Sequence, residues 1–195
     1  MDVPLFPLRT VLFPGGPLPL RIFESRYIDL ISQCMKNESP FGVVLIREGT
    51  ETGLATTYDV GTLANITDWY QGSDGLLGVT AVGGQRFRLL SGRQQASGLN
   101  IGEIEVIPPE PPMALPDEYA SLRKILEGVL DDLGRLYESL ERRSDDAVWV
   151  TYRLLEVLPI ELEQKQQFLE SSDTMARLKL IDELLNTVRG SAKGY

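Results

Sequence analysis

The feature that most constrains this chain is a run of prolines near its middle. Four of residues 108–112 are proline, within the stretch PPEPPMAL that spans 108–115. Proline fixes φ and lacks a backbone N–H, so this run favours a stiff, extended connector over a helix or a central strand. Because the hydrophobic pattern also changes here, we predict a first subdomain over 1–107, a connector over 108–116 and a second subdomain over 117–190.

The first part holds most of the 18 glycines and has patterns typical of short strands. One helix is predicted over 25–37, where apolar residues fall on a single helical stripe. Pro17 and Pro19 suit an edge strand, and Gly83-Gly84 predicts that a long β run is broken and sharply bent. Many short strands and one small helix indicate a strongly bent, partly closed β-barrel. Strands are predicted over 3–8, 18–23, 41–47, 59–69, 76–83, 85–90 and 101–107.

The second part has helical periodicity. Apolar residues recur at spacings of three and four from Asp117 to Arg142, which predicts one long helix. Three further helices are predicted over 144–158, over 161–170 and after Asp173, whose carboxylate can cap the last of them. The predicted fold class is therefore α+β, with a helical bundle in the C-terminal part.

Composition removes several classes of function. The chain has no histidine and one cysteine, Cys34, which excludes imidazole-based catalysis and cysteine- or histidine-rich zinc sites. On the predicted helix, Cys34 is expected to be a small buried side chain. A net charge of −9 argues against nucleic acid as a partner. We expect no metal and no other cofactor.

The hydrophobic pattern also bears on location. No run of about 18 apolar residues is present, so no membrane span is expected. The first ten residues lack the basic start and apolar core of a signal peptide. These patterns predict a cytoplasmic protein without a membrane partner.

Several segments carry a family resemblance. They include PLFPL at 4–8, VLFPG at 11–15, PLRIFESRY at 19–27, FGVV at 41–44, VGTLA at 60–64 and GQRF at 84–87. With these segments the chain resembles the N-terminal, substrate-binding domain of Lon proteases, in a form that stands alone. The resemblance implies a PUA-like bent β-barrel followed by a C-terminal helical bundle.

The catalytic parts of such proteases have no counterpart in these residues. No G-x-x-x-x-G-K-[ST] loop is present to hold nucleotide phosphates. Ser191 and Lys193 fall in a predicted tail, where a serine nucleophile would lack a rigidly held base. The resemblance therefore implies a non-enzymatic module that binds unfolded or degron-bearing polypeptides, as an adaptor or chaperone. Its expected partners are polypeptide clients or a protease or chaperone, and a homo-oligomer is compatible with the sequence.

Two sets of residues are candidates for a site. An apolar polypeptide-binding surface could be formed by six aromatic residues that otherwise would fill the core: Phe13, Phe23, Tyr27, Trp69, Tyr70 and Phe87. A structural ion pair is predicted for Glu24, with Arg86 as its first-choice partner and Arg26 as its second, because a carboxylate at the edge of the core needs a partner.

Two other function classes remain open at this level. Arg86, Arg88 and Arg93 form the most basic stretch and could belong to an RNA- or nucleotide-binding PUA-like protein. Glu103 and Glu105 share one strand face and could serve a carboxylate-dependent hydrolase, although a solvated strand face is the favoured explanation.

Overall fold

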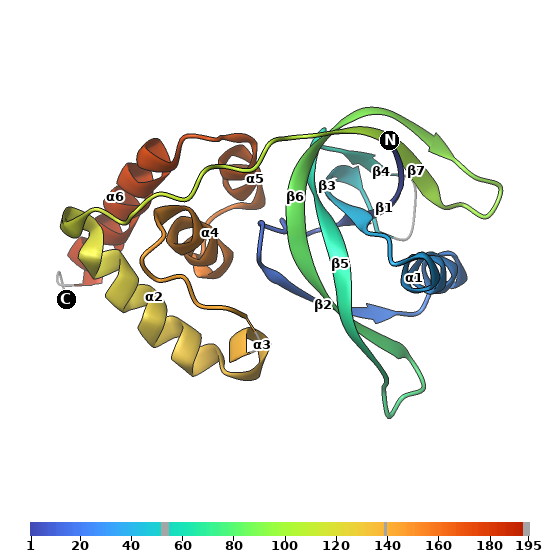
Figure 1. The fold of residues 1–195 in the computed structure, drawn as a ribbon, viewed down its shortest axis with the longest axis horizontal. Coiled ribbons are helices and arrows are strands. Elements are labelled where there is room, and N and C mark those ends of the chain that lie inside the picture. The colour runs from blue at the N-terminus through green and yellow to red at the C-terminus, as the bar shows by residue number, and fades with distance from the viewer. Residues whose placement is uncertain (52–54, 139, 193–195) are drawn as a thin grey trace. The chain divides into compact units, whose positions relative to one another are not determined.

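The chain forms two compact units, which are described separately. The computed structural model describes residues 1–51, 55–138 and 140–192. The first unit is Met1–Pro109 and the second is Glu110–Tyr195. The α+β class is confirmed, because the first unit is mainly sheet and the second is helical (Figure 1).

The first unit is one strongly bent sheet. Its pairings follow the path β1-β7-β6-β5-β3-β4. In addition, β1 pairs with β3 in parallel, and β2 pairs with β6 in an antiparallel arrangement. The remaining pairs are antiparallel. The strands are β1 (Asp2–Leu8), β2 (Pro17–Ile22), β3 (Phe41–Gly49), β4 (Ala55–Thr57), β5 (Val60–Gln71), β6 (Leu77–Gln94) and β7 (Asn100–Val106).

The long β6 strand replaces two predicted strands. It continues through Gly83 and Gly84, so the predicted break is wrong and the bend is made within a continuous strand. Its pairing with β5 shifts register between Thr62 and Ala64, opposite this glycine pair. Gly83 also exchanges backbone hydrogen bonds with the Gly15-Gly16 turn, donating its N–H to Gly16. These bonds replace the ladder bonds that a regular strand would make at the bend.

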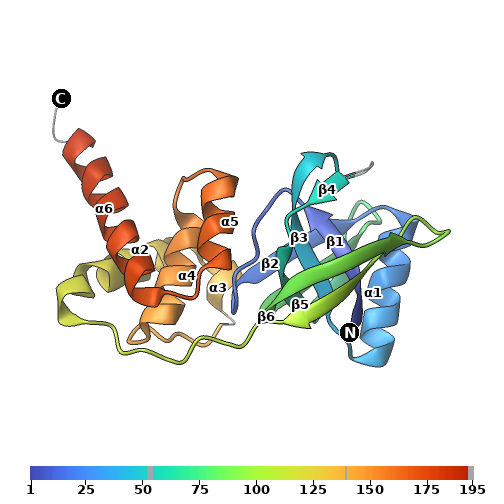
Figure 2. The same cartoon turned by 90° about the horizontal axis from the view of Figure 1, so that it is seen from above.

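Helix α1 (Ser25–Asn37) covers one side of this sheet, as two views show (Figures 1 and 2). Its buried residues are Tyr27, Leu30, Ile31 and Cys34, which follow the spacing of one helical face. Tyr27 stacks on Phe6 of β1 with ring centroids 4.0 Å apart. The helix therefore covers the larger of two apolar clusters in this unit.

The second unit is a bundle around α4 (Ala147–Val157), which lies between α2 (Ala120–Leu133) and α6 (Thr174–Ala192) in Figure 1. A short 3-10 turn (Asp117–Tyr119) precedes α2, α3 (Arg135–Glu138) follows it, and α5 (Leu162–Glu170) links α4 to α6. No helix among the described residues is long and apolar enough to cross a membrane.

The predicted helix over 117–142 is wrong in its length. Gly134 ends α2 with φ +54° and ψ −126°, a conformation that residues with a Cβ rarely adopt. The other helices begin and end close to their predicted positions. Asp146 caps α4 by accepting a bond from the Val148 N–H, and Asp173 accepts one from the Ala176 N–H at the start of α6.

The second half of the proline-rich connector is part of the helical unit. The backbone N–H of Leu115 donates to Asp145, and that of Ala147 donates to Met113. Ahead of this contact, the carboxylate of Glu110 accepts hydrogen bonds from Arg177 at 2.7 and 3.1 Å. The side chain of Arg177 is fully buried and that of Glu110 is 4% exposed, so this ion pair fixes the connector to α6.

Burial and hydrogen bonding have opposite effects on the pKa of Glu110. Burial alone would raise the pKa of its carboxyl group, but bonds from Arg177, Thr174 and Tyr152 outweigh that effect and hold the pKa below its usual range. The guanidinium of Arg177 also lies over the Tyr152 ring, 4.4 Å from its centroid. The charged form of Glu110 is therefore the form that the fold requires.

Glu110→Ala should lower the free energy of unfolding by about 3–5 kcal/mol, because it leaves the buried guanidinium without its counter-ion. The double variant Glu110→Ala/Arg177→Met should lose less than the sum of the single variants. Urea denaturation of the four proteins measures this coupling. Additive losses would contradict a direct contribution of the pair.

Candidate functional site

The six aromatic candidates divide into buried and exposed residues. Phe13, Tyr27 and Phe87 are 0, 4 and 0% exposed and belong to the core, so they offer no surface to a polypeptide in this structure. Phe23 and Trp69 are 63 and 56% exposed. Tyr70, the sixth, is 50% exposed. The surface expected from the sequence is therefore restricted to three residues.

The exposed residues lie on the arm formed by β2, β5 and β6, but they do not form one patch. Trp69 and Tyr70 are neighbours in a strand, so their side chains point to opposite faces. Tyr70 covers Gly78 of β6, where an added Cβ would lie 2.3 Å from its ring. Phe23 follows the end of β2. Tyr70 thus packs on its own sheet, and Trp69 is left to face the α1 side.

Trp69 borders a hollow of about 430 Å³ between the C-terminal end of α1 and β5. We call it the α1–β5 hollow. Its walls combine the last turn of the helix with five consecutive residues of the strand, and it is lined by Cys34, Met35, Glu38, Ser39, Asn65, Ile66, Thr67, Asp68 and Trp69. Burial raises the pKa of the Cys34 thiol, so Cys34 does not supply a reactive thiolate to the hollow.

The strand wall of the hollow is a free sheet edge. β3 pairs with β5 only at Thr62–Ala64. Beyond that point, within the described ranges of the chain, 65–71 pairs only with β6. Gly72 bonds to Leu76 at the hairpin end, so antiparallel alternation turns the backbone groups of Trp69 and Gln71 away from β6. The Trp69 N–H is held by the Asp68 carboxylate at 2.8 Å.

The charged residues of the hollow are both acidic. Glu38 lies just beyond the last turn of α1, and Asp68 is on the strand wall. Neither has an ion-pair partner among the residues that the structure describes. The C-terminal end of a helix carries partial negative charge, so it adds to the negative potential of the two carboxylates.

Sequence reasoning missed both acidic residues. Glu38 has φ +49°, the one positive φ among the described non-glycine residues. Helices commonly end on glycine or asparagine in this conformation, so nothing in the sequence marks Glu38 as the residue that adopts it. Asp68 could have been noted as the acid directly before the exposed Trp69.

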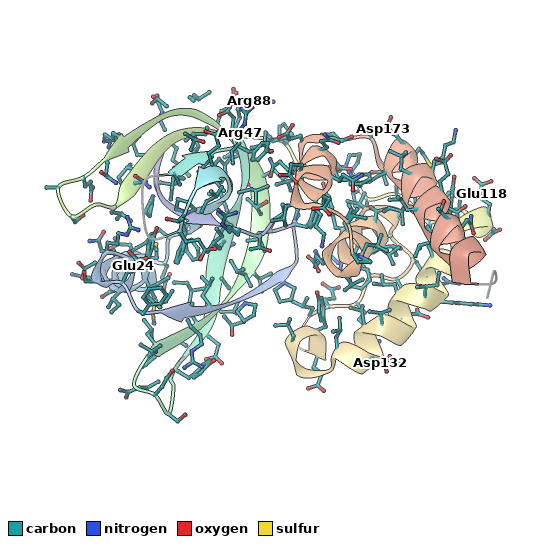
Figure 3. The ribbon with its side chains drawn as sticks, turned by 180° about the vertical axis from the view of Figure 1, so that it is seen from behind. Glu24, Arg47, Arg88, Glu118, Asp132 and Asp173 are labelled. Carbon is teal, nitrogen blue, oxygen red and sulfur yellow. The ribbon has the colours of Figure 1, made fainter. Side chains whose placement is uncertain are left out.

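Glu24 pairs with Arg26, which was predicted as its second-choice partner after Arg86. The Nε of Arg26 donates to Glu24 at 2.9 Å, and Figure 3 shows Glu24 beside α1. Arg86 is 3% exposed within β6, opposite Thr62. The reason is local: residues two apart at the start of a helix can pair without crossing the sheet.

Arg26 connects more elements than Glu24 does. It also donates to the carbonyl oxygens of Gly98 and Glu51, both at 3.1 Å, and its guanidinium lies 4.7 Å from the centroid of the Tyr27 ring. It therefore ties the start of α1 to the β6–β7 loop and to the chain after β3. These contacts explain the residue structurally without a ligand.

Arg26→Ala should lower the free energy of unfolding by about 2 kcal/mol, because three charge-assisted hydrogen bonds are lost. Glu24→Ala should cost about 1 kcal/mol, since its pair is partly solvated. Chemical denaturation of both variants tests the order. A larger loss for Glu24→Ala would show that the carboxylate has a partner beyond Arg26.

The residues proposed for RNA or nucleotide binding and for carboxylate-dependent hydrolysis do not form a common site. Arg86 is buried, Arg93 pairs with Asp2 at 2.6 Å, and Arg88 lies opposite Glu105 on β7. Glu105 and its neighbour Glu103 are exposed, and Glu103 accepts a bond from Ser91 at 3.0 Å. Among the described residues, no group of three or more histidine, cysteine or acidic side chains could hold a metal ion.

A cluster of strongly perturbed titratable groups lies in the helical unit. Burial raises the pKa of Glu156 to about 7, although Arg153 at 2.6 Å favours its charged form. The Tyr137 hydroxyl donates to Glu156 at 3.1 Å, and Lys165 donates to its backbone oxygen at 3.0 Å. The cluster joins α3, α4 and α5 and lines none of the surface hollows described in this unit. We interpret it as structural.

Stability should fall as pH rises through the titration of Glu156. Its folded-state pKa lies above the ordinary value of 4.5. The folded protein therefore holds an extra proton between about pH 4.5 and 7, and the loss over this window is about 3 kcal/mol. Glu156→Gln keeps a neutral side chain, so its unfolding free energy should decline less from pH 5 to 8. Thermal or urea unfolding at both pH values compares the slopes; equal slopes would contradict the prediction.

The bent sheet, its single covering helix and the helical unit place the chain in a known family. It belongs to the family of the ATP-dependent protease La (LON) substrate-binding domain, whose model matches residues 2–187. A crystal structure of a Lon N-terminal domain protein from Xanthomonas campestris is 35% identical, with a TM-score of 0.77 over 93% of this chain and 96% of that one.

Relatives of other sizes share the same region. The Lon protease of Anaeromyxobacter dehalogenans is 31% identical over 96% of this chain but only 23% of its own length. Protein cereblon of Danio rerio is 29% identical over 63% of this chain and 28% of its own length. The chain thus spans about a quarter of the length of the Lon proteases that it matches, and the matched part is the substrate-binding domain.

Proposed function

We propose that the protein is a non-catalytic module that binds unfolded or degron-bearing polypeptides, as an adaptor or chaperone. Family membership supports a substrate-binding module, and the catalytic domains of Lon proteases are not matched. The observation that carries the proposal is the exposed Trp69 at the junction of the α1–β5 hollow and a free strand edge.

This arrangement suits an unfolded polypeptide. A free strand edge can bond to the backbone of an added strand without regard to its sequence. An exposed aromatic ring beside a hollow supplies apolar contact area for a side chain of that strand. On this proposal, the partners of the protein are polypeptide clients and a protease or chaperone, and the protein can also associate with itself. The alternative of RNA or nucleotide binding lacks support, because Arg86, Arg88 and Arg93 form no shared basic surface.

Trp69→Ser should weaken binding of fluorescently labelled casein at least tenfold, because tryptophan side chains at the centre of an interface contribute about 2 kcal/mol or more. Leu90→Ser is the matched control, since Leu90 is also 56% exposed and lies on β6 outside the hollow. Fluorescence anisotropy measures the affinities.

Phe23→Ser and Tyr70→Ser should have smaller effects, since neither residue lines the hollow. The casein should be recovered intact, and ATP should not change its binding. The proposal fails if Trp69→Ser and Leu90→Ser bind casein equally well, or if the protein cleaves casein in a manner abolished by mutating one of its own residues.

A further inference from the structure

We infer that the α1–β5 hollow receives a lysine or arginine side chain of the bound polypeptide, so that the module favours basic residues beside apolar ones. The inference rests on the proposed function and specifies which polypeptides the site selects. It starts from the fact that Glu38 and Asp68 are the charged groups lining the hollow, with no lysine or arginine among its lining residues.

Charge complementarity selects the occupant. Two carboxylates without ion-pair partners among the described residues belong to residues that line the same hollow, and the C-terminal end of α1 adds partial negative charge there. An apolar side chain would leave this potential uncompensated, and an acidic one would be repelled. A basic side chain would gain from both carboxylates while remaining close to solvent, so the cost of desolvating its charge stays small.

The other lining residues fit the rest of such a side chain. Lysine and arginine carry long apolar stems below a charged head. Met35 and Ile66 provide aliphatic surface for the stem, and both lie within the hollow. The Trp69 ring, 56% exposed, can accept a cation against its face.

The strand edge determines how the side chain would arrive. A polypeptide paired along the outward carbonyl of Trp69 and the outward backbone groups of Gln71 directs every second side chain toward the α1 face. Asp68 holds the Trp69 N–H, so this carboxylate lies at the edge where the added strand would run.

The experiment uses the full chain with Trp149→Phe, which leaves Trp69 as its one tryptophan reporter. Three peptides of about twelve residues share one neutral, partly apolar sequence and carry lysine, norleucine or glutamate at the centre. Titration followed by Trp69 fluorescence should give at least fivefold tighter binding of the lysine peptide than of the norleucine peptide, and weaker binding of the glutamate peptide. Added salt should reduce the preference for lysine.

Glu38→Gln and Asp68→Asn should each reduce the preference for the lysine peptide over the norleucine peptide to less than twofold. Asp68→Asn keeps the oxygen that accepts the Trp69 N–H. Asp29→Asn removes a carboxylate elsewhere on α1 and should keep the preference, because Asp29 does not line the hollow. Glu38→Gly is a second test of the same carboxylate, since its φ of +49° suits glycine and the fold should be retained.

Equal binding of the lysine and norleucine peptides would overturn the inference while leaving polypeptide binding intact. An equal loss of preference in Asp29→Asn and Glu38→Gln would also overturn it, because the effect would then follow net charge. Failure of all three peptides and of casein to bind would overturn both the inference and the proposed function.

Discussion

The structure of the first unit depends on one strand that pairs with three others. β6 is 18 residues long, and it pairs with β5 over 77–88, with β2 over 77–82 and with β7 over 87–94. A strand of this length cannot stay flat in a small sheet, so it bends where Gly83 bonds to the Gly15-Gly16 turn. The sheet is bent with it, and β1 can pair with β7 on one side and with β3 on the other.

The same bend leaves the candidate site open. β3 pairs with β5 along only three residues before the two strands part. The remainder of β5 stays with β6 and β2 in an arm that has α1 on one face. Free edges usually invite unwanted pairing. Here Asp68 occupies the outward N–H of Trp69, which protects part of the edge without closing the hollow beside it.

The sequence predicted the elements better than their junctions. Apolar spacing was sufficient for α1, because its buried face follows one helical stripe. It failed at Gly134, since the apolar period continues across a residue that ends the helix through its backbone conformation. Spacing also does not determine which side chains the folded sheet covers, and three of the six aromatic candidates are buried. Glu38 was missed because its position matters only where α1 meets β5.

The carboxylates of the proposed site lack ion-pair partners among the described residues, whereas a buried carboxylate of the helical unit has one. In the helical unit Glu110 is buried and its carboxylate is paired with Arg177, so its charge stabilises the fold. At the hollow, Glu38 and Asp68 remain without such partners among the described residues, and folding gains little from their charge. Two carboxylates without ion-pair partners among the described residues contribute nothing comparable to the fold. The two carboxylates can instead interact with a ligand. A site made of one aromatic ring, two carboxylates and a strand edge can accept many polypeptide sequences.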